Sequence, residues 1–156
     1  MHRLLPALLL CIPGTVAAQA EVERLLAAPE APAGVVFEIV KGEEEALDWA
    51  LPQVARLSAR LRARFPELEV AVVSHGREQF GLLADAAGPL APIHAAARDL
   101  RGADIDLHVC GVHAGWEGHV PEDFPDYVDV AASGPAQIRD YRNLGFEVIR
   151  LERAPE

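Results

Sequence analysis

The residue best suited to do chemistry is Cys110, which ends a strand-forming stretch of alternating apolar and polar residues and is followed directly by Gly111. A glycine at this point lets the chain turn sharply and leaves the sulfur open to the next loop. A thiol presented in this way can act as a nucleophile or accept a sulfur atom. The alternative is that Cys110 is a small buried hydrophobic residue, since free cysteine is among the most buried residue types.

Histidines surround this cysteine in the sequence. His108 and His113 lie on either side of it, and His75 ends an earlier predicted strand. An imidazolium beside a sulfur favours the thiolate, so we expect His75 and His113 to tune Cys110. His108, Cys110 and His113 could instead hold a soft metal ion such as zinc or copper. They lack a second cysteine and an established ligand spacing, so we expect no metal and no other cofactor.

Further residues could bind a substrate near the thiol. Ser133 and Gly134 begin a predicted helix, whose free backbone N–H groups could hold an anion, although an ordinary helix cap would look the same. Trp116 could cover the thiol, or it could pack against the sheet or between protomers. The expected substrate-binding residues are Gly76, Gly111, Trp116, Ser133 and Gly134.

Two common enzyme classes are excluded by motif. The chain has no G-x-x-x-x-G-K-[ST] sequence, so it is no P-loop nucleotide hydrolase. Neither Ser74 nor Ser133 lies in a G-x-S-x-G setting, so no hydrolase elbow is supported.

The elements that would position these residues alternate along the chain. Strand-forming stretches occupy residues 35–40, 68–73, 105–110, 127–131 and 146–151, and helical patterns occupy 47–65, 77–87, 92–100 and 133–143. Residues 113–127 are expected to form a loop with short helical pieces. The alternation predicts an α/β, flavodoxin-like three-layer sandwich with a mostly parallel five-stranded sheet. Ligands on such sheets bind beyond the carboxyl ends of the strands, where Cys110 and His75 would lie.

The amino terminus has the pattern of a secretory signal peptide. A basic start at residues 1–3 precedes an apolar stretch, 4–18, and an A-x-A sequence ends at Ala20. We expect a signal peptide at 1–20, cut after Ala18 or Ala20, with an uncleaved anchor as the alternative. The mature protein would be periplasmic or secreted, without a stable membrane anchor. Its lead-in would be residues 21–33 and its single domain residues 34–153.

Composition sets wider limits. The 156 residues include 51% hydrophobic and 24% charged ones, which suits one folded domain. The formal net charge of −10 repels phosphate backbones, so nucleic acid is not an expected partner. Of two cysteines, Cys11 lies in the predicted signal peptide. The mature chain would therefore carry one thiol and no internal disulfide.

Three segments resemble the DsrE/DsrF-like family of sulfur-relay proteins: Ile105–Gly111, which ends on the cysteine, then residues 121–130 and 133–138. The second strand with Ser74-His75-Gly76 fits as well, so the resemblance spans about residues 34–151. It implies a small α/β sandwich, assembled as a trimer or hexamer, in which the cysteine ending this strand carries sulfur as a persulfide. By motif match that cysteine is Cys110.

The sequence and the resemblance together favour a periplasmic sulfur-handling protein, in which Cys110 accepts sulfane sulfur as a persulfide and passes it to a partner thiol. Whether it is a sulfurtransferase or only a carrier is left open. The alternatives are a non-enzymatic binding or assembly module with a packed Cys110, or a small metal-binding protein.

Assembly is the last expectation. Trp116, Phe124 and Tyr127 lie in one short loop, and three aromatic side chains there would be costly to expose to water. We expect a homo-oligomer whose interface includes residues 113–127, with a periplasmic sulfur donor or acceptor as a further partner. The alternative is that the loop folds back on its own sheet.

Overall fold

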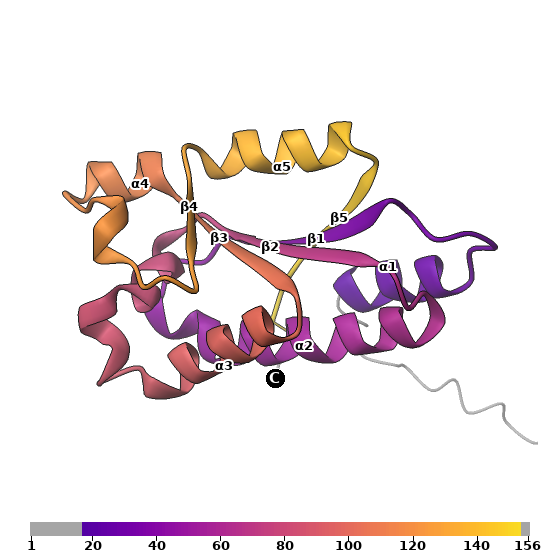
Figure 1. Ribbon diagram of the computed structural model, residues 1–156, viewed down its shortest axis with the longest axis horizontal. Coiled ribbons are helices and arrows are strands. Elements are labelled where there is room, and N and C mark those ends of the chain that lie inside the picture. Colours follow the sequence, from indigo (N-terminus) through magenta and orange to yellow (C-terminus); the bar gives the residue numbers. More distant parts are fainter. Residues whose placement is uncertain (1–16, 154–156) are drawn as a thin grey trace, which may run out of the picture.

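The computed structural model describes residues 17–153 (Figure 1). Its centre is a five-stranded sheet in the order β4-β3-β2-β1-β5, and every neighbouring pair is parallel. The strands are β1 (Gly34–Ile39), β2 (Glu69–Ser74), β3 (Ile105–Cys110), β4 (Asp129–Ala131) and β5 (Phe146–Arg150). The expected α/β fold is confirmed, and the sheet is all-parallel.

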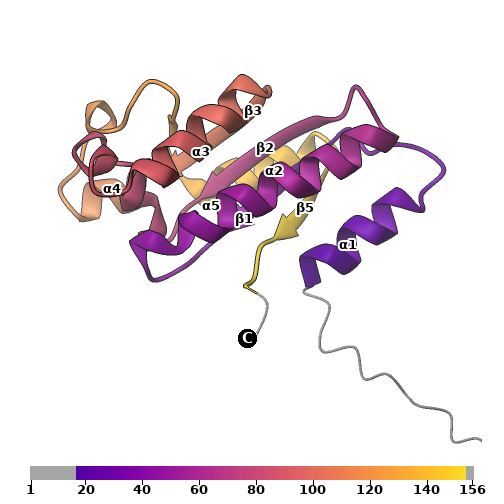
Figure 2. The same cartoon turned by 90° about the horizontal axis from the view of Figure 1, so that it is seen from below.

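Helices cover both faces of the sheet and make a flavodoxin-like three-layer sandwich. On one face lie α1 (Ala17–Leu26), α2 (Leu47–Arg64) and α3 (Ala91–Gly102). On the other face α5 (Gly134–Asn143) lies along the sheet, as Figures 1 and 2 show. The shorter helices are η1 (Glu44–Ala46), η2 (Arg77–Leu82), η3 (Ala84–Ala87), α4 (Gly111–Trp116) and η4 (Pro121–Asp123).

The two faces carry cores of different size. Beneath the sheet, the apolar faces of α1, α2 and α3 pack on inward residues such as Phe37, Val72 and Leu107. Above it, α5 covers a smaller cluster built on Val36, Val73 and Ile138. Because β1 is buried on both faces, it reads as a nearly continuous apolar run, as central strands of parallel sheets do.

The first part of the lead-in expected at residues 21–33 is helical. Residues 17–26 form α1, which buries Ala18, Val22 and Leu25 against α2 and β5. These three residues share one helical face, a spacing hidden within a segment rich in alanine and glutamate. Both expected cleavage points, after Ala18 and after Ala20, fall within α1; residues 1–16 of the predicted signal peptide lie outside the described range.

The helix expected over residues 77–87 is two 3₁₀ helices, η2 and η3, separated by Leu83 in an extended conformation. Residues 78–82 are buried without interruption, so this segment is packed on several sides instead of presenting one apolar face. Gly81 also approaches the backbone closely, because a Cβ there would lie 2.6 Å from the Glu44 carbonyl oxygen.

The aromatic argument for assembly is wrong for two of its three residues. Phe124 is buried in the core beneath the sheet, and Tyr127 packs against the same core. The Tyr127 hydroxyl lies 2.6 Å from His94 Nδ1, so its polar end is also satisfied. Of the three, only Trp116 remains exposed, at 79%.

Within residues 17–153, no helix combines the length and the apolar character needed to cross a membrane.

Candidate functional site

The alternation of β3 places Cys110 on the α5 side of the sheet. Ile105, Leu107 and Val109 point into the core beneath the sheet, so His108 and Cys110 face the other way. Cys110 ends the strand and opens onto a pocket of about 230 Å³ at the carboxyl edge. We call it the Cys110 pocket; it is lined by His75, Cys110, Val112, His113, Trp116, Ser133 and Pro135.

Cys110 is itself held tightly. Its side chain is buried, with 4% of the residue exposed, and it is the free cysteine of the described chain. Its backbone N–H donates a hydrogen bond of 2.7 Å to Oε1 of Gln79. Gln79 is fully buried in η2, and its Nε2 has no hydrogen-bond partner among residues 17–153. The hydrogen bond that the carboxamide makes in the described chain thus fixes the backbone of the residue that bears the thiol.

His75 follows β2 and is oriented by an acidic residue from β1. Its Nε2 lies 2.9 Å from Glu38 Oε1, so the ring N–H donates to the carboxylate. This hydrogen bond lowers the pKa of Glu38 against the opposing effect of burial, and the carboxylate stays ionised. The backbone N–H of His75 donates a 3.1 Å hydrogen bond to the Ile39 carbonyl oxygen, so the main chain of His75 is fixed to β1 as well.

His113 comes from α4 and is fixed in turn to His75. Its Nδ1 lies 3.1 Å from the His75 carbonyl oxygen, so Nδ1–H donates, and in a neutral ring Nε2 is the nitrogen that can accept a proton. The ring packs edge-on against Phe80, with centroids 5.1 Å apart, and lies 6.0 Å from the Trp116 ring. Within residues 17–153, the ring hydrogen bonds of both imidazoles therefore go to oxygen atoms, not to the Cys110 sulfur.

The amino terminus of α5 meets the same edge. Ser133 is its N-cap and accepts a 3.4 Å hydrogen bond from the Ala136 N–H. Gly134 packs so closely that a Cβ there would lie 2.4 Å from His75 Cβ and 3.3 Å from Cys110 Cβ. The positive end of the α5 dipole thus lies beside the cysteine.

A buried carboxylate holds the turn that carries His75. Glu78 is fully buried and accepts hydrogen bonds from the Ser74 hydroxyl at 2.8 Å, the Gly76 N–H at 3.0 Å and the Lys41 N–H at 2.6 Å. Gly76 has no room for a side chain, because a Cβ would lie 2.2 Å from Glu78 Oε2. Glu78 therefore joins the ends of β1 and β2 behind the pocket.

Most of the site residues expected from sequence lie together. His75, His113, Trp116 and Ser133 line the pocket with Cys110, and Gly134 packs against its wall. Gly76 and Gly111 are not among the lining residues: Gly76 belongs to the Glu78 turn, and Gly111 starts α4.

The sequence did not assign Glu38, Glu78 and Gln79 to this site, and it named neither Val112 nor Pro135 as a binding residue. A signal existed for Glu38, which is the acidic residue in an otherwise apolar strand. Glu78 and Gln79 carry no such signal, because their burial depends on the tertiary fold.

The metal alternative gains no support from the geometry. His108 Nε2 lies 2.9 Å from the Tyr141 hydroxyl, and burial lowers the pKa of His108. His113 is bonded to a carbonyl oxygen, as described above. The described residues contain no group of three or more histidine, cysteine or acidic side chains able to hold a metal ion.

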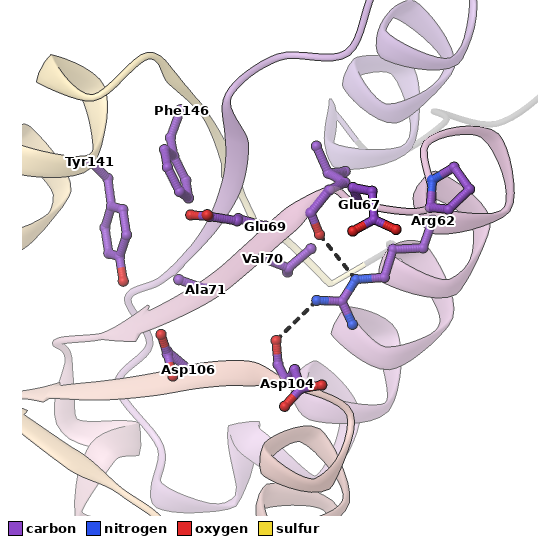
Figure 3. A pocket seen from close by; sticks show the side chains of 11 residues that line it. Arg62, Glu67, Glu69, Val70, Ala71, Asp104, Asp106, Tyr141 and Phe146 are labelled. Carbon is purple, nitrogen blue, oxygen red and sulfur yellow. Dashed lines mark hydrogen bonds between the residues drawn. The ribbon is translucent and has the colours of Figure 1, made fainter.

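A larger pocket of about 360 Å³ lies at the amino ends of β2 and β3, where Figure 3 shows its lining. Its arginine, Arg62, donates to the carbonyl oxygens of Leu68, Ala103 and Asp104. Its Asp106 is ion-paired with Arg101 at 2.6 Å. Arg62 thus ties α2 to the loops before β2 and β3, which is a structural role. Among the described residues, no cysteine, serine, threonine, histidine or lysine lines this pocket.

Comparisons with known proteins support the fold but assign no family and no function. No protein-family model matches the chain, and no curated protein matches it. A solved structure, described as a protein of unknown function, MTH1491 from Methanobacterium thermoautotrophicum, is similar with a TM-score of 0.63. The two chains are 23% identical, and the match covers 75% of this chain and 97% of that one. This chain therefore shares the α/β fold of that protein.

Proposed function

We propose that the protein is an exported sulfur carrier of the DsrE/DsrF-like type, in which Cys110 holds sulfane sulfur as a persulfide. The observation that carries the proposal is the position of the Cys110 thiol. It lies in a pocket at the carboxyl edge of a parallel sheet, beside two histidines and the amino terminus of α5. Each of these neighbours supports an anionic sulfur more readily than an inert, packed thiol.

The chemistry is a transfer of sulfane sulfur. The Cys110 thiolate attacks the terminal sulfur of a donor R–S–SH, a new S–S bond forms on Cys110, and the donor S–S bond breaks. One S–S bond replaces another, so no external oxidant is consumed, and the leaving R–S⁻ takes up the proton that the Cys110 thiol lost. His113, whose Nε2 can accept a proton in a neutral ring, is the group we assign to receive the proton of the thiol.

The second half of the cycle passes the sulfur on. A partner thiolate attacks the outer sulfur of the Cys110 persulfide, and the Cys110 thiolate is the leaving group. We place this reaction in the periplasm or outside the cell, in keeping with the signal-peptide pattern of residues 1–20. A periplasmic donor or acceptor protein is the proposed partner.

Cyanolysis tests this function, because cyanide removes sulfane sulfur as thiocyanate, which can be quantified. After incubation with a hydropersulfide and desalting, the wild-type protein should release about one thiocyanate per chain, given one reactive thiol. The Cys110→Ser variant should release none. Equal release from both proteins would contradict the proposal.

The rival function is a binding or assembly module in which Cys110 is merely packed. One observation favours it, namely that only 4% of the residue is exposed. Thiol titration with and without denaturant separates the two. A thiol that reacts only in the unfolded protein supports the rival, and a thiol that reacts in the folded protein supports the carrier.

We also propose that the protein assembles as a homo-oligomer, a trimer or a hexamer. Trp116 and Val112 on α4, together with nearby Val120, remain exposed apolar side chains beside the site. Light scattering at micromolar concentration tests this assembly. A mass near that of one chain would refute it, and Trp116→Ala should shift an oligomer toward monomer.

A further inference from the structure

The wall of the Cys110 pocket is mostly apolar. Three of its residues are Val112, Trp116 and Pro135, and the first two are 44% and 79% exposed. These side chains lie where a group entering from solvent toward Cys110 would meet them. They offer apolar surface to that group and few hydrogen bonds, so burial of an apolar substituent is the main attraction available.

The pocket has few groups that could bind an anion. In the described part of the chain, no lysine, arginine, aspartate or glutamate lines it. Arg77, two residues after His75, is not a lining residue. Its guanidinium nitrogens lie 3.5 Å from a Glu117 carboxylate oxygen and 4.0 Å from a Glu44 carboxylate oxygen, so its charge is already paired. The whole protein carries a formal net charge of −10, and such a field repels anionic ligands from a distance.

The one fixed positive element beside the pocket is the amino terminus of α5, and it lies against Cys110 itself. It therefore supports the charge that the reaction places on the protein, first as thiolate and then as persulfide. A doubly charged donor such as thiosulfate would compete with that charge for the same helix end.

We infer that the sulfur donor is a low-molecular-weight hydropersulfide whose organic group is small, apolar and uncharged, and not a sulfur oxoanion. This inference rests on the proposed function and deepens it. The pocket holds about 230 Å³, below the roughly 300–1,000 Å³ typical of drug-sized ligands, so the apolar group is small. It packs between Trp116 and Pro135 while its terminal sulfur meets the Cys110 thiolate.

Two thiol reagents of matched reactivity test the donor class without requiring persulfide chemistry. Benzyl methanethiosulfonate is neutral and 2-sulfonatoethyl methanethiosulfonate is anionic. Each forms a mixed disulfide on a thiolate and releases methanesulfinate. The rate ratio for Cys110 is compared with the ratio for 2-mercaptoethanol at pH 8. We expect the preference for the benzyl reagent to be about tenfold greater on the protein.

Two variants show whether the apolar wall is responsible. Trp116→Ala, assayed at a concentration at which light scattering gives it the same mass as the wild type, should lose most of the benzyl preference. Leu144→Ala removes another exposed apolar side chain, 68% exposed at the far end of α5, and should leave the preference unchanged. A loss of equal size in both variants would contradict the assignment of Trp116.

The outcomes separate this inference from the proposed function. If the anionic reagent matches the benzyl reagent relative to 2-mercaptoethanol, the donor class is wrong, while cyanolysis can still support a persulfide carrier. If both reagents modify Cys110 only in urea, the pocket admits no donor, and the inference and the proposed function both fail.

Discussion

The backbone N–H of Cys110 donates to the side-chain oxygen of Gln79 across 2.7 Å. The pairing of β2 with β3 ends at Val109, one residue before the cysteine. The carboxamide of Gln79 therefore extends the hydrogen bonding of the sheet to the residue that bears the thiol. Because Gln79 is fully buried, no water can replace this acceptor without a change in packing.

Removing that acceptor should destabilise the protein and loosen the thiol. Gln79→Leu leaves the Cys110 N–H buried without a partner, which costs about 1–3 kcal/mol in the free energy of unfolding. Urea denaturation measures this cost, and alkylation rates across a pH series show whether the thiol has moved. Gln53→Leu is the control, because Gln53 is a half-buried residue of α2. It should change neither the free energy of unfolding nor the alkylation rate by much. Equal stability of the Gln79 and Gln53 variants would contradict the assigned role.

Gly134→Ala should disturb the contact between α5 and the site. The added Cβ would lie 2.4 Å from His75 Cβ, closer than real Cβ contacts, so His75 or the helix must shift. We expect a loss of about 1–3 kcal/mol in stability, together with a changed alkylation rate of Cys110. Gly115→Ala is the matched control, because nothing lies within 4 Å of its built Cβ. If Gly134→Ala is as stable as Gly115→Ala and has the same alkylation rate, the close approach of α5 to His75 is contradicted.

The order of elements could be predicted from sequence because the strands and helices have strong, distinct patterns. The third strand was predicted at 105–110, as observed, since its apolar positions alternate and Gly111 follows. The two 3₁₀ helices of segment 77–87 could not be predicted, because the burial of residues 78–82 comes from contacts on several sides. The face of α1 was overlooked because an A-x-A pattern at Ala18–Ala20 was interpreted as a processing signal.

The candidate site was only partly predictable for a related reason. Strand ends can be located from sequence, and in parallel sheets they meet at one edge, so Cys110 and His75 could be placed together. Their partners could not, because Glu38, Glu78 and Gln79 act through tertiary hydrogen bonds. The contact of Gly134 with both site residues likewise depends on how closely α5 packs on the sheet.

Stability should fall as the pH drops below about 6.5. Burial lowers the pKa of both His94 and His108 below the ordinary value of 6.5. Between the folded and unfolded pKa values the unfolded chain binds more protons, so acid favours unfolding there. Urea denaturation between pH 8 and pH 5 should show this loss, and His94→Gln should flatten it.

A flat stability profile across that range would contradict a lowered pKa for His94 and His108 in the folded protein.

The helix α1 should contribute to the stability of the domain. Leu25 is buried against the core, so Leu25→Ala should cost about 2–5 kcal/mol. Leu144→Ala, at an exposed leucine, should cost much less. Thermal or urea denaturation compares the two variants. Equal stabilities would show that α1 does not pack on the folded domain in solution.

The position of the proposed cleavage site decides how much of α1 the mature chain would keep. Removal of residues 1–20 leaves Val22 and Leu25 on the mature chain, so the buried face of the helix would survive except for Ala18. If the proposed export occurs, amino-terminal sequencing of the protein recovered outside the cytoplasm should find a start at or before Glu21. A start beyond Leu25 would mean that the mature domain folds without α1.

The most direct test of the central claim is the mass of the protein after exposure to a hydropersulfide. We predict that intact-mass spectrometry shows a gain of about 32 Da, one sulfur atom, which peptide mapping assigns to Cys110 and a reductant removes. The Cys110→Ser variant should keep its original mass. An unmodified Cys110 in the folded wild-type protein, under conditions that modify the urea-unfolded chain, would contradict the account.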